Sequence, residues 1–229
     1  MKVAIDGPAG AGKSTVARAI ARQRGFVYLD TGAMYRSVAL LALEGGVALD
    51  DEDSLADIAS SIELTFEPDG EGGQRVYVGQ RDVSTQIRTP LVDSSVSAVS
   101  SVPSVRTAMV ALQRKLAGQA DVVAEGRDIG TVVFPDAEVK VFLTADARAR
   151  AHRRSVQNVQ RFGADAPQET EEAIYQRILQ RDTADSTRST APLVAAADAV
   201  HIDSSAMGVD QVVQKVGDLI DAVKAEGKA

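Results

Sequence analysis

Residues 7–14, GPAGAGKS, lie between the apolar run KVAID and the helix-compatible run STVARAIARQRG. They match the pattern G-x-x-x-x-G-K-[ST], in which a glycine-rich turn between a strand and a helix presents backbone N–H groups to phosphate oxygens. The positive end of the helix dipole adds to this attraction. In such a loop Lys13 reaches the β- and γ-phosphates and the Ser14 hydroxyl ligates Mg²⁺. An accidental glycine turn is the alternative, and the strand and helix on either side disfavour it.

This loop predicts a P-loop core that binds a purine nucleoside triphosphate, with ATP as the expected phosphoryl donor and Mg²⁺ as its metal. The residues expected to contact the nucleotide are Gly7, Pro8, Ala9, Gly10, Ala11, Gly12, Lys13, Ser14 and Thr15.

The rest of the chain is predicted to form an α/β fold around that loop. Five short apolar runs have the composition of buried strands, and helical patterns lie between or after most of them. This alternation is typical of a parallel sheet with helices on both faces, so we expect a five-stranded parallel sheet. The predicted strands are 3–6, 26–29, 122–125, 139–143 and 199–202.

One interval interrupts this alternation. Residues 62–83 have the pattern of two or three short strands joined by a glycine-rich turn. A serine-rich stretch follows, and then a helix is predicted from Ser104 to about Ala117, with Ser104 as its cap. We therefore predict an inserted, strand-bearing domain over 62–118 within a core made of 1–61 and 119–229.

Composition limits the classes of protein to consider. The chain has 229 residues, no cysteine and a formal net charge of −7. The missing cysteines exclude disulfides, thiol catalysis and thiolate metal sites, and the negative charge argues against a protein that coats nucleic acid. No apolar stretch approaches the roughly 20 residues of a membrane span, and no signal peptide is evident. We expect a cytoplasmic monomer without nucleic-acid or membrane partners.

Other classes of P-loop protein fit less well. A GTPase switch would carry the guanine-recognition motif N-K-x-D, which does not occur in the sequence. A motor, transporter ATPase or helicase would need a longer chain or a partner domain. Transfer of a phosphoryl group to a small molecule remains, and the acceptor is the open question.

Polar residues follow two of the predicted strands where open α/β sheets bind ligands, at the carboxyl edge. After the second strand come Asp30, Thr31, Tyr35 and Arg36. Asp30 or Thr31 could simply cap a helix and Tyr35 could be partly core, but a buried Arg36 needs an anionic partner, and a phosphate would suit it.

The segment EGRD at 125–128 follows the third predicted strand. Arg127 can bind an anion there, and Asp128 can accept hydrogen bonds from an amine or hydroxyl. A local ion pair among Glu125, Arg127 and Asp128 is the alternative. Glu125 is either structural or a carboxylate that orders the water shell of Mg²⁺.

Two arginine-rich segments complete the predicted site. Arg181, Asp185 and Arg188 would line one face of a helix, where an ordinary salt bridge is the alternative to a sugar-phosphate ligand. A lid at about 153–170 would bring Arg153 and Arg154 onto the triphosphate, although a solvated helix face is also possible.

With these motifs assembled, the chain resembles the bacterial cytidylate kinases, a family of nucleoside monophosphate kinases. The resemblance rests on IDGPAGAGKST at 5–15, LDTGAMYR at 29–36, EGRDIGTVVFPDA at 125–137, AHRR at 151–154, and RDTADSTR with the following APLV at 181–194. It implies that the insertion binds the nucleoside monophosphate and that the enzyme phosphorylates CMP or dCMP with ATP.

The resemblance also implies a role for each acceptor-side residue. Thr31, Tyr35 and Arg36 would flank the acceptor nucleotide, with Arg36 and Arg127 on its phosphate. Ser97, Arg106 and Asp128 would recognise the cytosine edge, Arg181 and Asp185 would hold sugar and phosphate, and Arg188 would lie near the base. Lys13, Arg127, Arg153, Arg154 and Arg181 are the expected catalytic residues. A kinase of another small molecule and a non-catalytic ATP-binding sensor are the competing hypotheses.

Overall fold

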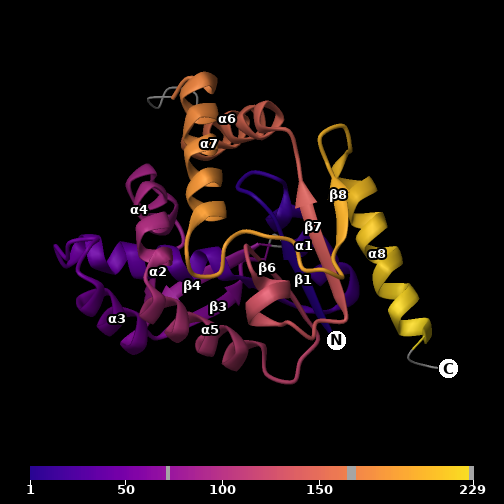
Figure 1. The fold of residues 1–229 in the computed structure, drawn as a ribbon, viewed down its shortest axis with the longest axis horizontal. Helices are drawn as coiled ribbons and strands as arrows, with labels where there is room; N and C mark the ends of the chain where they lie inside the picture. Colours follow the sequence, from indigo (N-terminus) through magenta and orange to yellow (C-terminus); the bar gives the residue numbers. More distant parts are fainter. Residues whose placement is uncertain (71–72, 164–168, 227–229) are drawn as a thin grey trace.

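The computed structural model describes residues 1–70, 73–163 and 169–226. At its centre lies the expected five-stranded parallel sheet (Figure 1). Every adjacent pair of its strands is parallel, which confirms the predicted α/β fold and places each predicted strand within one or two residues of its observed bounds. Across the sheet the strands are β2 (Val27–Asp30), β6 (Val122–Gly126), β1 (Lys2–Asp6), β7 (Val139–Thr144) and β8 (Val200–Asp203).

Apolar side chains on β1 alternate between two cores, one on each face of the sheet. Val3 and Ile5 belong to the core beneath α1 (Lys13–Arg24) and α8 (Val209–Glu226), whereas Ala4 belongs to the opposite core. Because successive strand residues point to opposite faces, a strand covered by helices on both sides must be apolar throughout. This is why the strands appear in the sequence as continuous apolar runs.

The second core is covered by α2 (Thr31–Glu44), α3 (Glu52–Ser61) and α5 (Pro103–Ala117). The region that follows α3 also contributes apolar side chains to this core. A separate antiparallel sheet is built there from β3 (Leu64–Pro68), β4 (Gln74–Val78) and β5 (Arg81–Asp82). Its three strands agree with the two or three that the sequence predicts over 62–83.

The serine-rich stretch forms a helix, α4 (Pro90–Ser101), reached through the short turn η1 (Gln86–Arg88). Ser94 and Ser95 both donate their hydroxyl hydrogen bonds back to the carbonyl oxygen of Leu91. These bonds satisfy the hydroxyls within the helix, so the serines do not break it.

The predicted cap at Ser104 is wrong. α5 begins at Pro103, and its N-cap is Val102, which makes no side-chain cap hydrogen bond. Proline suits the first helical position because its fixed φ matches the helix and no N–H is needed there. Only one residue separates α4 from α5, so the turn places the helix start before Ser104.

Two further helices stand above the carboxyl edge of the sheet, α6 (Ala147–Phe162) and α7 (Glu171–Thr187) (Figure 1). They share a small core of Ala151, Ile174 and Ile178. The predicted lid at 153–170 includes residues 164–168, which lie outside the described residues. Among those that are described, no helix is both long and apolar enough to cross a bilayer.

Candidate active site

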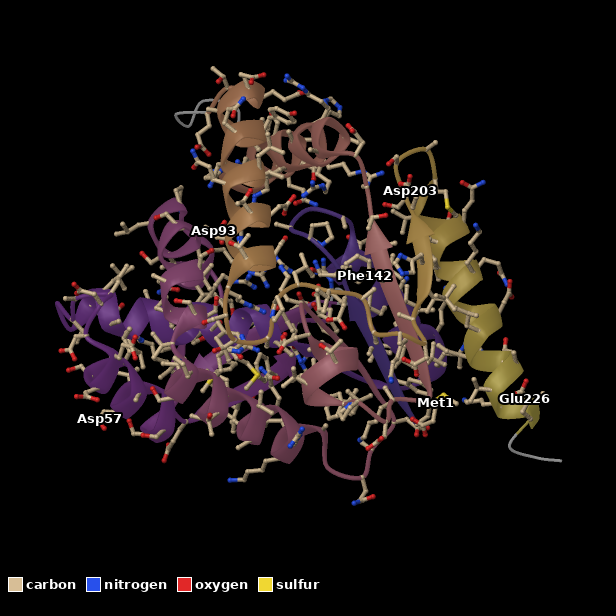
Figure 2. The ribbon with its side chains drawn as sticks, in the orientation of Figure 1. Met1, Asp57, Asp93, Phe142, Asp203 and Glu226 are labelled. Atoms are coloured by element: carbon tan, nitrogen blue, oxygen red, sulfur yellow. The ribbon has the colours of Figure 1, made fainter. Side chains whose placement is uncertain are left out.

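A cavity of about 880 Å³ opens at the carboxyl edge of the parallel sheet, between the phosphate loop and the helices α2, α4, α6 and α7. Polar side chains crowd the space where α7 approaches α4, near Asp93 (Figure 2). Nine of the ten predicted acceptor-side residues line this cavity: Thr31, Tyr35, Arg36, Arg106, Arg127, Asp128, Arg181, Asp185 and Arg188. The tenth, Ser97, does not.

Ser97 lines a neighbouring cavity of about 330 Å³ between α4 and α7. From the same helix, Ser100 lines the larger cavity, and its carbonyl oxygen accepts a hydrogen bond from Arg106 at 3.2 Å. In this conformation the serine of α4 that borders the larger cavity is therefore Ser100.

The phosphate loop joins β1 to α1, and its glycines are required by geometry. A Cβ on Gly7, which has φ of 147°, would lie 2.0 Å from the carbonyl oxygen of Leu143. Gly12 occupies the N-cap of α1 in a left-handed conformation, and no side chain caps the helix. The first amides of α1 can therefore donate to an anion in the cavity.

Lys13, the first residue of α1, is buried and donates to the carbonyl oxygen of Pro8 at 2.8 Å. Burial lowers the pKa of Lys13 to about 7, and the positive charge of Arg127 adds to this effect. Glu125 and Asp6 oppose it. A phosphate group beside this ammonium would favour the charged form, since opposite charges raise the pKa of a lysine.

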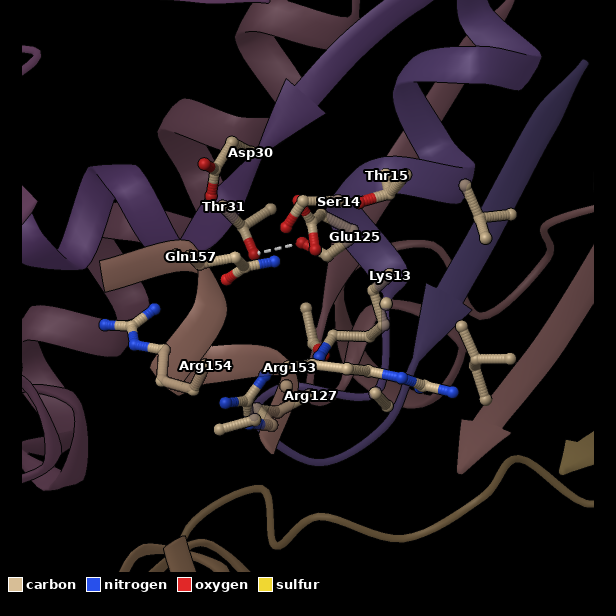
Figure 3. Close-up of a pocket in the computed structure, with 18 of the residues that line it drawn as sticks. Lys13, Ser14, Thr15, Asp30, Thr31, Glu125, Arg127, Arg153, Arg154 and Gln157 are labelled. Carbon is tan, nitrogen blue, oxygen red and sulfur yellow. Dashed lines mark hydrogen bonds between the residues drawn. The ribbon is translucent and has the colours of Figure 1, made fainter. Parts of the chain in front are cut away.

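Ser14, Thr15 and Glu125 lie together at one side of the cavity, with Lys13 directed into it (Figure 3). One Glu125 carboxylate oxygen accepts a 2.5 Å hydrogen bond from the Tyr28 phenol. Hydroxyl and carboxylate oxygens are ligands that Mg²⁺ accepts directly or through water, so this donor set fits the ion.

The acceptor side begins with Asp30, the N-cap of α2, which accepts from the Ala33 amide at 2.8 Å. Its carboxylate also accepts from Arg36 at 3.2 Å and lies 3.6 Å from Arg88. Burial would raise the pKa of Asp30, but these two arginines hold it below its ordinary value. Asp30 is thus both a helix cap and the anionic partner of the largely buried Arg36.

Thr31 lines the cavity, and its hydroxyl also has a structural partner within the chain. Its hydroxyl donates to the backbone carbonyl of Glu125 at 2.6 Å, the bond drawn in Figure 3. The bond joins the end of β2 to the end of β6 at the floor of the cavity.

The three charges at 125–128 do not pair with one another. Glu125 accepts from Tyr28, Arg127 donates from Nε to Asp185 at 2.7 Å, and Asp128 accepts from Arg106. The alternative of a local ion pair is therefore wrong. Each side chain joins the end of β6 to another segment of the chain.

Asp128 and Arg106 form a buried ion pair beside the ring of Tyr35. Burial raises the pKa of Asp128 above its ordinary value, although Arg106 and Arg188 oppose the rise. Arg188 lies 4.0 Å from the second carboxylate oxygen of Asp128. The geometry leaves a carboxylate flanked by two guanidiniums facing the cavity, which is suited to a ligand with both donors and acceptors.

α7 carries Arg181 and Asp185 on the face toward the cavity, as predicted, but Arg188 lies at its C-cap with extended backbone angles. The prediction that all three share one helical face is correct only for the first two. Burial lowers the pKa of Arg181 to about 10, with Arg127 adding to the effect. Burial would raise the pKa of Asp185, but Arg127 and Arg181 hold it below its ordinary value.

Both predicted lid arginines border the cavity from α6. Arg153 donates to the hydroxyl of Ser204 at 3.2 Å and to its carbonyl oxygen at 2.6 Å. Arg154 forms an ion pair with Asp93 of α4, which connects α6 to the inserted region.

Several residues that line the cavity or support it closely were not among the predicted site residues. Asp93 and Ser204 border the cavity, and Asp6 lies directly before the phosphate loop. Buried Arg150 donates to the carbonyl oxygen of Ala9 at 3.0 Å. The position of Asp6 at a strand's carboxyl end was the one sequence signal that could have singled it out.

A phosphate loop with a buried lysine, placed opposite several arginines in one cavity at the carboxyl edge of a parallel sheet, defines the class of P-loop kinases. The cytidylate kinase family model matches residues 3–222 of this chain. The chain belongs to the cytidylate kinase family and is a kinase, which confirms the resemblance drawn from the motifs.

Curated relatives agree with this assignment along nearly their whole length. The cytidylate kinase of Mycobacterium avium is 49% identical, over 95% of this chain and 94% of its own. That of Pelotomaculum thermopropionicum is 48% identical over 98% and 97%, and that of Carboxydothermus hydrogenoformans is 45% identical over 96% and 97%.

Proposed function

We propose that this site transfers the γ-phosphoryl group of ATP to the phosphate of CMP or dCMP, giving CDP or dCDP and ADP. This is the activity of the family to which the chain belongs. The observation that carries the proposal is that Lys13 and the residues Arg127 and Asp128 face one cavity of about 880 Å³. A cavity of that size can hold two nucleotides with their phosphates toward each other.

The donor lies along the phosphate loop in this proposal. The amides of residues 9–15 and the Lys13 ammonium bind the β- and γ-phosphates, and the nucleoside extends toward Arg153, Ser204 and Met207 at that end of the cavity. Ser14, with Glu125 beside it, would hold Mg²⁺, which when bound neutralises charge on the β- and γ-oxygens.

The acceptor lies against the opposite wall, formed in part by 62–118, which we propose as the domain that binds the monophosphate. Arg36 and Arg127 hold its phosphate, with Arg181 and Asp185 at sugar and phosphate. Thr31 and Tyr35 border the nucleotide. Arg36 and Arg127 are each engaged by a carboxylate in the present structure, so acceptor phosphate would replace or share those partners, whereas the buried Nε of Arg181 has no hydrogen-bond partner among the described residues and is free for the ligand.

Recognition of the base is assigned to Asp128, Arg106 and Arg188. Ser97 of α4 is assigned to the base as well, which requires it to turn from the neighbouring cavity that it lines in this structure. An ionised Asp128 accepts from the exocyclic amine of cytosine, whereas uracil presents an oxygen there and would be repelled. Arg106 donates to ring acceptors. The direct Arg106–Asp128 ion pair keeps both groups fixed before the base arrives.

The chemistry requires no strong general base, because the attacking phosphate oxygen of the acceptor is already anionic. The residues act by alignment and by neutralising charge: Lys13, Arg127 and Arg181 surround the transferring group, and Arg153 and Arg154 approach it from α6. Enclosure by α6 and α7 would exclude water, which otherwise competes as acceptor. We also propose that the enzyme is a monomer in the cytoplasm.

An acceptor panel tests the proposal. ADP formation from ATP is followed with CMP, dCMP, UMP, AMP and shikimate in turn, using the purified protein. CMP and dCMP should give kcat/KM values well above the others. A strong preference for any other acceptor would refute the proposed function, and nucleotide binding without ADP formation on any acceptor would favour the sensor hypothesis.

A further inference from the structure

Asp6 is a buried carboxylate that the proposed mechanism does not use. It is the last residue of β1 and directly precedes Gly7 of the phosphate loop. Its register places it opposite Gly126, the residue before Arg127, and its exposed fraction is 4%. A buried carboxylate is unfavourable unless hydrogen bonds compensate it, so its partners indicate its role.

Those partners are two backbone amides on the acceptor side. Oδ1 of Asp6 accepts from the Ile129 amide at 2.8 Å, and Oδ2 accepts from the Gly130 amide at 2.7 Å. These are the first amides of η2 (Ile129–Val133), a single π-helical turn. The first amides of a helix have no partner within it, so Asp6 caps η2 from a neighbouring strand.

The residue that would ordinarily cap η2 is Asp128, which occupies its N-cap position. Aspartate is favoured at N-caps because its carboxylate accepts from the first free amides. Here the Asp128 side chain makes no cap hydrogen bond and instead binds Arg106. An N-cap side chain accepts from the second or third amide of its helix, and Asp6 already occupies the second, that of Gly130, so the Asp128 carboxylate is available to face the cavity.

Close packing around this corner makes its geometry sensitive. A Cβ on Gly126 would lie 2.7 Å from both the Ile129 Cδ1 and the Thr31 Oγ1 atoms. A Cβ on Gly130 would lie 3.4 Å from Oδ2 of Asp6 and 3.2 Å from the Lys140 side chain. Backbone this tightly enclosed has few alternative arrangements, so the amides of Ile129 and Gly130 stay aligned with the Asp6 carboxylate.

We infer that Asp6 is a positioning residue for acceptor specificity, because it caps η2 in place of Asp128 and so keeps the Asp128 carboxylate on the acceptor base. The inference rests on the proposed function in one respect, namely that Asp128 recognises the amine of cytosine. It also gives the phosphate loop a direct connection to the acceptor side, since Asp6 and Gly7 are adjacent in the chain.

Asp6→Asn is the informative change. The side-chain amide has almost the same shape but only one oxygen, so it meets one of the two backbone amides with an N–H group. Where that amide is the one of Gly130, Asp128 can accept from it in the ordinary N-cap geometry. At pH 8 we expect KM for CMP to rise about tenfold and the preference for CMP over UMP in kcat/KM to fall about tenfold, as expected for one misplaced charged hydrogen bond. KM for ATP should stay within about threefold.

Asp51→Asn is the matched control. Asp51 caps α3 by accepting from the Ser54 amide at 3.1 Å, and it does not line the cavity. Asparagine still caps a helix, so this variant removes only the charge of a capping carboxylate and should leave the CMP to UMP ratio unchanged. The comparison separates loss of charge at a helix cap from loss of position at the acceptor base.

An unchanged CMP to UMP ratio in folded Asp6→Asn would overturn the inference. If Asp6→Asn does not fold, Asp6→Ser is measured instead, because its smaller uncharged hydroxyl still accepts a hydrogen bond; failure of both to fold would overturn the inference by assigning Asp6 to stability alone. Wild-type protein inactive on CMP would refute the proposed function, whereas an active wild type with an unaltered Asp6→Asn ratio refutes only the inference.

Discussion

Arg127→Ala should depress turnover and CMP affinity together while sparing ATP binding. Arg127 donates to Asp185 at 2.7 Å, and its side chain is 18% exposed, so it is positioned before the acceptor binds. A hydrogen bond to a charged group contributes about 1.5–3 kcal/mol, which corresponds to roughly 10- to 150-fold in kcat/KM.

Asp185, which loses its partner in Arg127→Ala, enlarges the expected fall in kcat/KM. Asp185 is buried, and the variant leaves its carboxylate to Arg181 and Arg188, which already neighbour it. Those arginines reduce the penalty of an unpaired buried charge but are drawn away from the acceptor phosphate. We therefore expect kcat/KM for CMP to fall about 100- to 1,000-fold.

Steady-state kinetics with a coupled ADP assay and calorimetric titration with a non-hydrolysable ATP analogue measure the two effects separately. The dissociation constant of the analogue should remain within about threefold. Arg81→Ala is the control, since Arg81 pairs with Glu44 at 2.7 Å on the surface, outside the cavity. Wild-type-like kcat/KM for CMP in Arg127→Ala would refute the assignment of Arg127 to the acceptor phosphate.

Three further predictions address other parts of the site. The pKa of Lys13 is about 7 in the fold against 10.5 for the free side chain, so binding of ATP at pH 8.5 should be accompanied by uptake of a proton. Calorimetric titrations in two buffers of different ionisation enthalpy would show this uptake as a difference in heat, and equal heats would contradict it. Between these values the unfolded chain binds the extra proton, so the stability contributed by Lys13 rises with pH, and Lys13→Met should flatten that slope in thermal unfolding. Gly7→Ala places a Cβ 2.0 Å from the Leu143 carbonyl oxygen and should lower the free energy of unfolding by more than about 2 kcal/mol. The control Gly46→Ala, whose Cβ meets open space, should lower it by about 1 kcal/mol. Similar losses in the two variants would be inconsistent with the close approach of Gly7 to Leu143. Asp128→Asn should lower the CMP to UMP ratio at least tenfold in competition assays, because the amide can donate to uracil, and a retained ratio would assign base discrimination elsewhere.

Local sequence was sufficient for the fold class and for the donor side. The phosphate loop is a continuous segment whose glycines, lysine and serine act at fixed spacing between one strand and one helix, so its geometry is local. The strands were predictable because burial on both faces makes them apolar throughout. Ser104 failed as a cap because the start of α5 is fixed by Pro103 and the one-residue turn from α4.

The acceptor side depended on contacts between segments far apart in the chain. Arg127 lies 58 residues from Asp185, and Asp6 lies 123 residues from Ile129. Sequence spacing does not specify such pairs; they follow from the position of β6 beside β1 and of α7 over the sheet. The sequence could thus nominate Arg127 as an anion-binding residue, but its carboxylate partner was not predictable.

By itself the sequence determined that this is a P-loop α/β protein with a donor loop at 7–14, and its motifs indicated the family, because both are patterns within short continuous stretches. Only the tertiary structure decided that Glu125, Arg127 and Asp128 each bind a different segment. It also decided that Asp6 caps η2, although Asp128 occupies the N-cap position. Hydrogen-bond partners are chosen by proximity in the folded chain, and strand order sets that proximity.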